Sequence, residues 1–102
     1  MKACCREYLL GQFDNDEEVV GEIYAEYVSS LSQKLDEIDQ ALAAGDFTAI
    51  DRTAHAIKGN SLAAGDQAVA DTAISTRNAA KLQDADEVKA LLAKLRELFE
   101  EL

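Results

Sequence analysis

The sequence predicts an all-α fold, specifically an antiparallel up-down four-helix bundle with a short extra N-terminal helix. The chain contains no proline, is 48% apolar and is rich in alanine, leucine, glutamate and lysine, which are good helix formers. Its apolar residues recur at the spacing of one helix face, and glycines and aspartates separate the apolar stretches. With 102 residues the chain is expected to form a single domain, residues 1–102.

The first two helices are predicted from apolar phase and from a group of acidic cap residues. A short helix over residues 3–12 would place Tyr8, Leu9 and Phe13 against the bundle. Residues 14–16 then offer N-cap candidates for a long second helix. Its apolar stripe comprises Val19, Val20, Ile23, Tyr24, Tyr27, Val28, Leu31, Leu35, Ile38 and Leu42.

Two Gly-Asp pairs predict the next two turns. Gly45 ends the long helix and Asp46 caps the third helix, and Gly65 and Asp66 repeat the arrangement before a fourth, alanine-rich helix that runs to about residue 81. The inward face of the third helix holds Ile50, Ala54, Ile57 and Ser61.

A last helix begins at Asp84, and the short turns between consecutive helices favour antiparallel neighbours. Its apolar stripe comprises Val88, Leu91, Leu92, Leu95, Leu98, Phe99 and Leu102.

The charge excludes several classes of partner. Twenty acidic residues against ten basic ones give a net charge of −10, which disfavours nucleic acid and anionic membrane as partners. The sequence has no apolar run of membrane-spanning length and no signal peptide pattern, so a cytoplasmic protein is expected. We also expect a monomer, although the short first helix leaves packing against a second copy open.

The cysteines, Cys4 and Cys5, are adjacent, which disfavours a disulfide between them and fits a reducing compartment. A metal site would require both thiols and His55 to converge with a carboxylate, and no ligand spacing supports that. No metal and no cofactor are therefore expected in this chain.

His55 is the only histidine of the chain and lies roughly 130° from the centre of the buried arc of the third helix, so it is predicted to face water. Lys58 and Gly59 follow one turn later on the same side, where Leu62 and Asp66 are also expected. A neutral imidazole is a nucleophile near pH 7, and an adjacent ammonium can stabilise an arriving phosphoryl group.

Two simpler interpretations remain open at this point. An exposed histidine beside a lysine also occurs on ordinary solvated helix faces. A glycine inside a helix costs about 1 kcal/mol relative to alanine, and either clearance for a partner or close approach of a neighbouring helix explains Gly59.

Residues 55–61, HAIKGNS, resemble the signature of histidine-containing phosphotransfer (HPt) domains, in which a histidine is followed by an apolar residue, Lys-Gly and small polar residues. The preceding segment ALAAGDFTAIDRTAH and the leucine-rich last helix are similar to the family as well, so the resemblance covers most of the chain.

The resemblance implies that His55 accepts a phosphoryl group through Nε2 from the aspartyl phosphate of one receiver domain and passes it to an aspartate of another. It implies that Lys58 stabilises charge and that Gly59 leaves room for the receiver. Separately from the resemblance, a receiver with an acidic active site needs a local basic patch on this acidic chain, which Arg52, Lys58 and Arg77 could supply, and Leu62 is expected on the same side. The implied partners are response-regulator receivers and a hybrid histidine kinase, with magnesium on the receiver and no kinase activity in this chain.

The sequence departs from the family pattern at three points. Gly65-Asp66 replaces a common Gly-Ala and would place a carboxylate near the docking surface. The segment VADTAISTRNAAK is poor in large apolar residues. Some members orient the histidine ring with a glutamine, whereas this chain offers Arg77 or Asn78, so the ring-orienting residue stays unassigned.

Two other functions compete with the phosphocarrier. A degenerate module could dock a receiver or a kinase without being phosphorylated, but it would have no use for the intact His-x-x-Lys-Gly. A hydrolase could pair a cysteine or serine with His55, but no nucleophile lies in a strained turn beside a base and an orienting acid.

Overall fold

The computed structural model describes residues 1–102 and contains five helices and no strand, which confirms the expected all-helical class. The helices are α1 (Ala3–Gln12), α2 (Glu17–Ala43), α3 (Phe47–Ala63), α4 (Gln67–Lys81) and α5 (Ala85–Glu100). None of the five combines the length and the apolar character that crossing a membrane would require.

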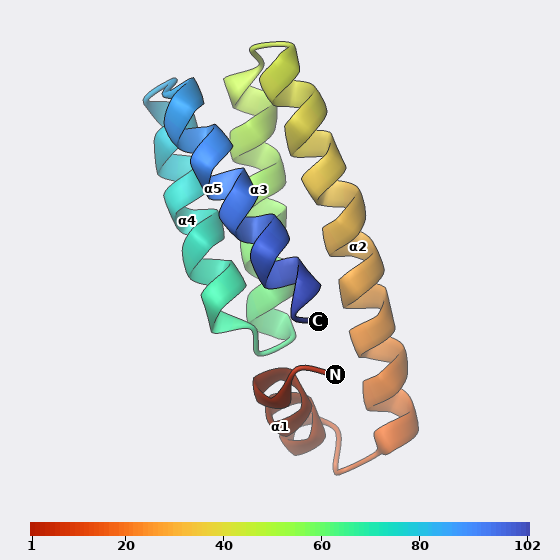
Figure 1. The fold of residues 1–102 in the computed structure, drawn as a ribbon. Helices are drawn as coiled ribbons and strands as arrows, with labels where there is room; N and C mark the ends of the chain where they lie inside the picture. Colours follow the sequence, from red (N-terminus) through yellow and green to blue (C-terminus); the bar gives the residue numbers. More distant parts are fainter.

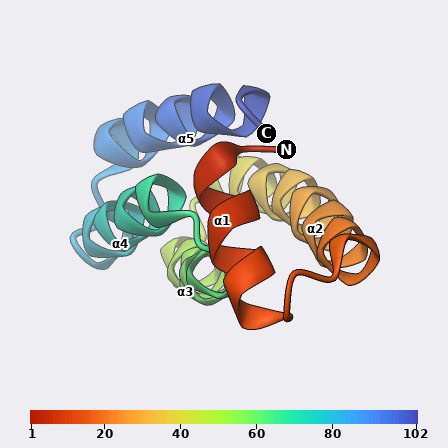
Figure 2. The same ribbon diagram turned by 90° about the horizontal axis from the view of Figure 1, so that it is seen from below.

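Helices α2 to α5 lie side by side, and α1 lies across one end of them (Figure 1). Each of the four packs against the next in the chain, with the most extensive packing between α3 and α4, and α2 also packs against α5. Figure 2 shows α1 crossing beneath the turn that joins α3 to α4. Helix α2 has 27 residues and extends beyond the other three helices (Figure 1). Helix α1 packs against α2.

Four of the helices begin at an aspartate whose carboxylate accepts a hydrogen bond from the backbone N–H three residues later. These N-caps are Asp16, Asp46, Asp66 and Asp84. Gly45 and Gly65 have φ of +69° and +77°, a left-handed conformation that glycine adopts without a steric penalty. Both predicted Gly-Asp turns are therefore present.

The core is formed by the predicted stripes of α2 and α5, except Val19, and by the predicted inward face of α3; Val19 is half-buried and lies outside the core. All four residues expected on that inward face are buried. Helix α4 buries residues on two adjacent sides, namely Val69, Ala70, Thr72, Ala73, Thr76, Ala79 and Ala80. These side chains are small, which allows α3 to pack closely against α4.

The prediction for α1 was right in its bounds but partly wrong in its contacts. Leu9 is fully buried, whereas Tyr8 and Phe13 are 42% and 40% exposed. Cys5, one helical turn before Leu9, fills the second buried position. Tyr8 instead lies over the turn after α3, where a Cβ added to Gly65 would be 2.5 Å from the Cβ of Tyr8.

A buried ion pair fastens α1 to the α3–α4 turn. The side chain of Asp66 is fully buried and accepts hydrogen bonds from Lys2 Nζ at 2.7 Å and from Tyr27 Oη at 2.9 Å. Burial opposes the charged form of Lys2, but the hydrogen bond and the attraction to Asp66 outweigh this, so the pKa of Lys2 is raised. Burial, reinforced by Asp66, raises the pKa of Tyr27, which keeps its hydroxyl a donor.

The prediction that Asp66 lies near the docking surface is therefore wrong. As the N-cap of α4, the carboxylate turns back over the first turn of its own helix, towards Val69 N, and meets Lys2 and Tyr27 there.

We predict that Asp66→Ala lowers the free energy of unfolding by about 3–5 kcal/mol, because it removes one member of a buried ion pair and leaves Lys2 and Tyr27 without their acceptor. Asp46→Ala is the matched control: it removes the same kind of cap at an exposed site and should cost about 1 kcal/mol. Urea unfolding measures both, and equal losses would contradict the structural role of the Lys2–Asp66 pair.

Candidate functional site

The imidazole of His55 projects from the middle of α3 into solvent. Its neighbours Ala54 and Ile57 are 0% and 1% exposed, and this burial sets the rotation of the helix about its axis. His55 itself is exposed, as its phase predicts. No hollow in the surface is lined by His55, so the site suits contact with another macromolecule better than enclosure of a small molecule.

Arg77 of α4 lies between two side chains of α3. Its Nε donates a hydrogen bond to Oδ1 of Asp51 at 2.9 Å, and its Nη1 lies 2.9 Å from Nδ1 of His55. Nε2 of the ring makes no hydrogen bond within the chain. Of the two residues that the sequence offered beside the ring, Arg77 contacts it; Asn78 is exposed and makes no side-chain hydrogen bond with it.

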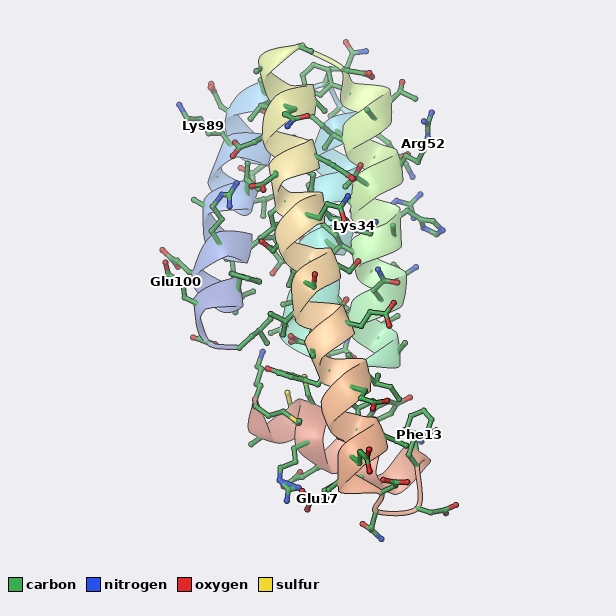
Figure 3. The ribbon with its side chains drawn as sticks, turned by 90° about the vertical axis from the view of Figure 1, so that its right-hand side faces the viewer. Phe13, Glu17, Lys34, Arg52, Lys89 and Glu100 are labelled. Atoms are coloured by element: carbon green, nitrogen blue, oxygen red, sulfur yellow. The ribbon has the colours of Figure 1, made fainter.

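Two cations near His55 have no acidic partner. Lys58 follows the histidine by three residues and Arg52 precedes it by three, and neither forms an ion pair within the chain. Figure 3 shows Arg52 extending from α3 away from the other helices, with Lys89 and Glu100 on the far side of the molecule. The surface around His55 is thus locally basic on a chain of net charge −10.

Gly59 is exposed, and a Cβ built on it would meet nothing within 4 Å. The alternative that a neighbouring helix requires this glycine is therefore wrong. The space over Gly59 is open to solvent, directly beside His55 on the helix surface.

Leu62 and Ile74 add apolar surface at this face, with exposed fractions of 41% and 39%. Helices α3 and α4 run in opposite directions from the turn at Gly65, so residues equally distant from the turn lie at similar levels. His55 precedes Gly65 by ten residues and Ile74 follows it by nine, which places Ile74 near the level of the histidine.

The other reactive side chains lie elsewhere. The hydroxyl of Ser61 is buried and donates to the backbone carbonyls of Ile57 and Lys58, as expected for its inward position. Cys4 and Cys5 are both free thiols on α1, and burial raises the pKa of Cys5 to about 12. No three metal-ligating side chains converge anywhere in the structure.

One feature of this face was not predicted from the sequence, and another was predicted only as a choice between two residues. The apolar contribution of Ile74 was missed because alanines dominate α4 and leave its phase ambiguous. The sequence offered Arg77 or Asn78 beside the ring but left the choice open, because the contact joins two helices and periodicity within one helix carries no information about it.

A family model described as the Hpt domain matches residues 22–102, from within α2 to the end of the chain. The chain belongs to the Hpt domain family. Membership implies a part in a phosphorelay, since Hpt domains are phosphocarriers that interact with receiver domains and kinases. No curated protein and no solved structure matches the chain.

Proposed function

We propose that this Hpt domain accepts a phosphoryl group on Nε2 of His55 from the aspartyl phosphate of a receiver domain and transfers it to the aspartate of another receiver. The observation that carries the proposal is the exposed ring of His55, flanked on one helix by an unpaired lysine and an unobstructed glycine. The ring is exposed, so a partner can bring its phosphoryl group in line with Nε2.

Lys58 has the role of stabilising charge on the phosphoryl group. It lies one helical turn from His55 and has no carboxylate to compete for its ammonium. Phosphoryl transfer depends mainly on alignment and on positive charge near the equatorial oxygens, and Lys58 supplies the second of these.

The docking surface comprises Arg52, Gly59 and Leu62 on α3 with Ile74 on α4. Gly59 gives the partner access to the ring, and the two apolar side chains lie beside it. A receiver that carries carboxylates around its aspartate is attracted to Arg52 and Lys58, while Arg77 neutralises the nearby Asp51.

We further propose that residues 1–102 act as one domain in which α2 to α5 form an antiparallel up-down bundle. The support is the Lys2–Asp66 ion pair, which links α1 to the turn between α3 and α4. Because Cys5 and Leu9 are buried within the same chain, α1 needs no second copy to cover them, which favours a monomer. The two free thiols fit a cytoplasmic location, and the domain would work without a cofactor or kinase activity of its own.

We predict that His55→Gln abolishes phosphorylation while the midpoint of thermal unfolding stays the same, because the side chain is exposed and adds little to the core. The protein is mixed with phosphorylated receiver domains from the same genome, and mass spectrometry is used to find an acid-labile phosphoryl group. Labelling of wild type alone supports the proposal. Receiver binding without any label on His55 would identify a docking module instead.

We predict that Lys58→Ala slows transfer at least about tenfold with little loss of receiver affinity, since the ammonium acts on charge that develops during transfer. Lys89→Ala is the control, because it removes the same charge from α5 on the far side of the molecule (Figure 3). Single-turnover transfer rates and calorimetric affinities separate the two effects. A variant as fast as wild type would refute the role of Lys58.

We predict that Gly59→Gln weakens receiver binding while stabilising the fold slightly, by up to about 1 kcal/mol. Gly21→Gln is the matched control, because Gly21 also lies inside a helix and a Cβ there also meets nothing within 4 Å. Both variants should gain stability, and only the first should lose affinity. Equal affinities would remove Gly59 from the docking surface.

A further inference from the structure

Arg77 is held in place by its own ion pair. Its side chain is 24% exposed, and that of its partner Asp51 is 30% exposed. Asp51 precedes His55 by four residues, so both side chains lie on the same face of α3 and reach the same guanidinium. One nitrogen of Arg77 is fixed by the carboxylate, and a second is thereby aimed at Nδ1 of the ring.

The contact with Arg77 determines which ring nitrogen of His55 carries the proton. A guanidinium has five N–H donors and no acceptor, so at 2.9 Å from Nη1 the nitrogen Nδ1 must be the acceptor. A neutral imidazole has a single N–H, which is then on Nε2. In that tautomer the lone pair of Nε2 belongs to the aromatic ring, and this nitrogen is not a nucleophile.

We propose that Arg77 is a positioning residue that keeps Nδ1 of His55 unprotonated, both in the resting ring and in the phosphorylated ring, and that it must leave Nδ1 while the phosphoryl group is transferred. This inference rests on the proposed function. It concerns how the phosphoryl group is stored and adds no catalytic group to those named above.

The steps of phosphoryl uptake balance as follows. Arg77 leaves Nδ1, Nε2 gives its proton to water and Nδ1 takes one from water, which frees the lone pair of Nε2. Nε2 attacks phosphorus, the bond from phosphorus to the aspartyl oxygen breaks, and its electron pair stays on the departing carboxylate. The proton on Nδ1 then returns to water and Arg77 donates to Nδ1 again.

Arg77 therefore protects the stored phosphoryl group. The Nε2–P bond breaks most easily when Nδ1 is protonated, because the ring then leaves as neutral imidazole. A proton on Nδ1 would face the guanidinium directly and would have no acceptor there. The carboxylates of a docked receiver compete with His55 for the same guanidinium, so docking favours release of Arg77 and transfer to the receiver.

The tautomer can be read in the unphosphorylated protein. His55 is the only histidine, so long-range ¹H–¹⁵N correlation spectra of the ¹⁵N-labelled full chain at alkaline pH report this ring alone. We expect one tautomer in wild type, with the proton on Nε2, and a mixture in Arg77→Met. Arg77→Lys, which keeps a donor without an acceptor, should restore part of the Nε2–H preference. A proton on Nδ1 in wild type would overturn the inference.

The lifetime of the phosphorylated protein tests the storage role. Phosphoramidate, a small phosphoryl donor, is used to load His55 without a receiver, and ³¹P spectra follow the decay of the label. Arg77→Met should shorten the half-life roughly tenfold, the effect expected from loss of a charge-assisted hydrogen bond. Arg96→Met is the control. Arg96 on α5 also forms ion pairs with carboxylates, but its partners Asp36 and Asp39 lie on α2.

The possible results separate this inference from the proposed function. Equal half-lives for wild type and Arg77→Met would overturn the storage role, even if His55 proves to be the phosphoryl acceptor. A shortened half-life in Arg96→Met as well would assign the effect to general loss of stability and would also overturn it. Failure of wild type to take up the label from phosphoramidate and from every receiver would overturn the proposed function and this inference together.

Discussion

The burial of one face of α3 fixes the geometry of the whole site. Ile50, Ala54, Ile57 and Ser61 are almost completely buried, and together they define how the helix is rotated about its axis. A rotation that turned His55 inward would expose these residues to water and bury the polar ring without a hydrogen-bond partner. The exposure alone would lower the free energy of unfolding by about 1.5–3 kcal/mol for each large apolar side chain. The reactive ring is thus held outward by the packing of its neighbours.

Electrostatics then distinguishes this face from the rest of an acidic molecule. Ten more acidic than basic residues would repel an acidic partner, yet around His55 the local balance is reversed. Asp51 is neutralised by Arg77, and the fully buried Asp66 is neutralised by Lys2 at the end of the bundle, leaving Arg52 and Lys58 unpaired. The pairing of particular carboxylates therefore matters more for recognition than the net charge does.

The sequence predicted the features that depend on local rules, and failed where contacts join distant segments. Helix bounds, N-caps and the exposure of His55 follow from cap chemistry and from a period of 3.6 residues. The position of Asp66 was predicted wrongly because its partners, Lys2 and Tyr27, are 64 and 39 residues away in the chain. For the same reason the sequence offered Arg77 and Asn78 beside the ring without choosing between them: the choice depends on the level at which α4 packs against α3.

The level at which α4 packs against α3 is set at the turn between these two helices. This turn connects α1 to the site. Gly65 packs against Tyr8 of α1, and Asp66 is paired with Lys2, which directly precedes α1, so both residues of the turn contact the N-terminal segment. A shift of α4 along α3 by a single residue, about 1.5 Å, would displace the guanidinium of Arg77 relative to Nδ1 and weaken this contact. Helix α1 lies outside the residues matched to the Hpt family, yet it and the preceding Lys2 contact the turn from which α4, and with it Arg77, begins.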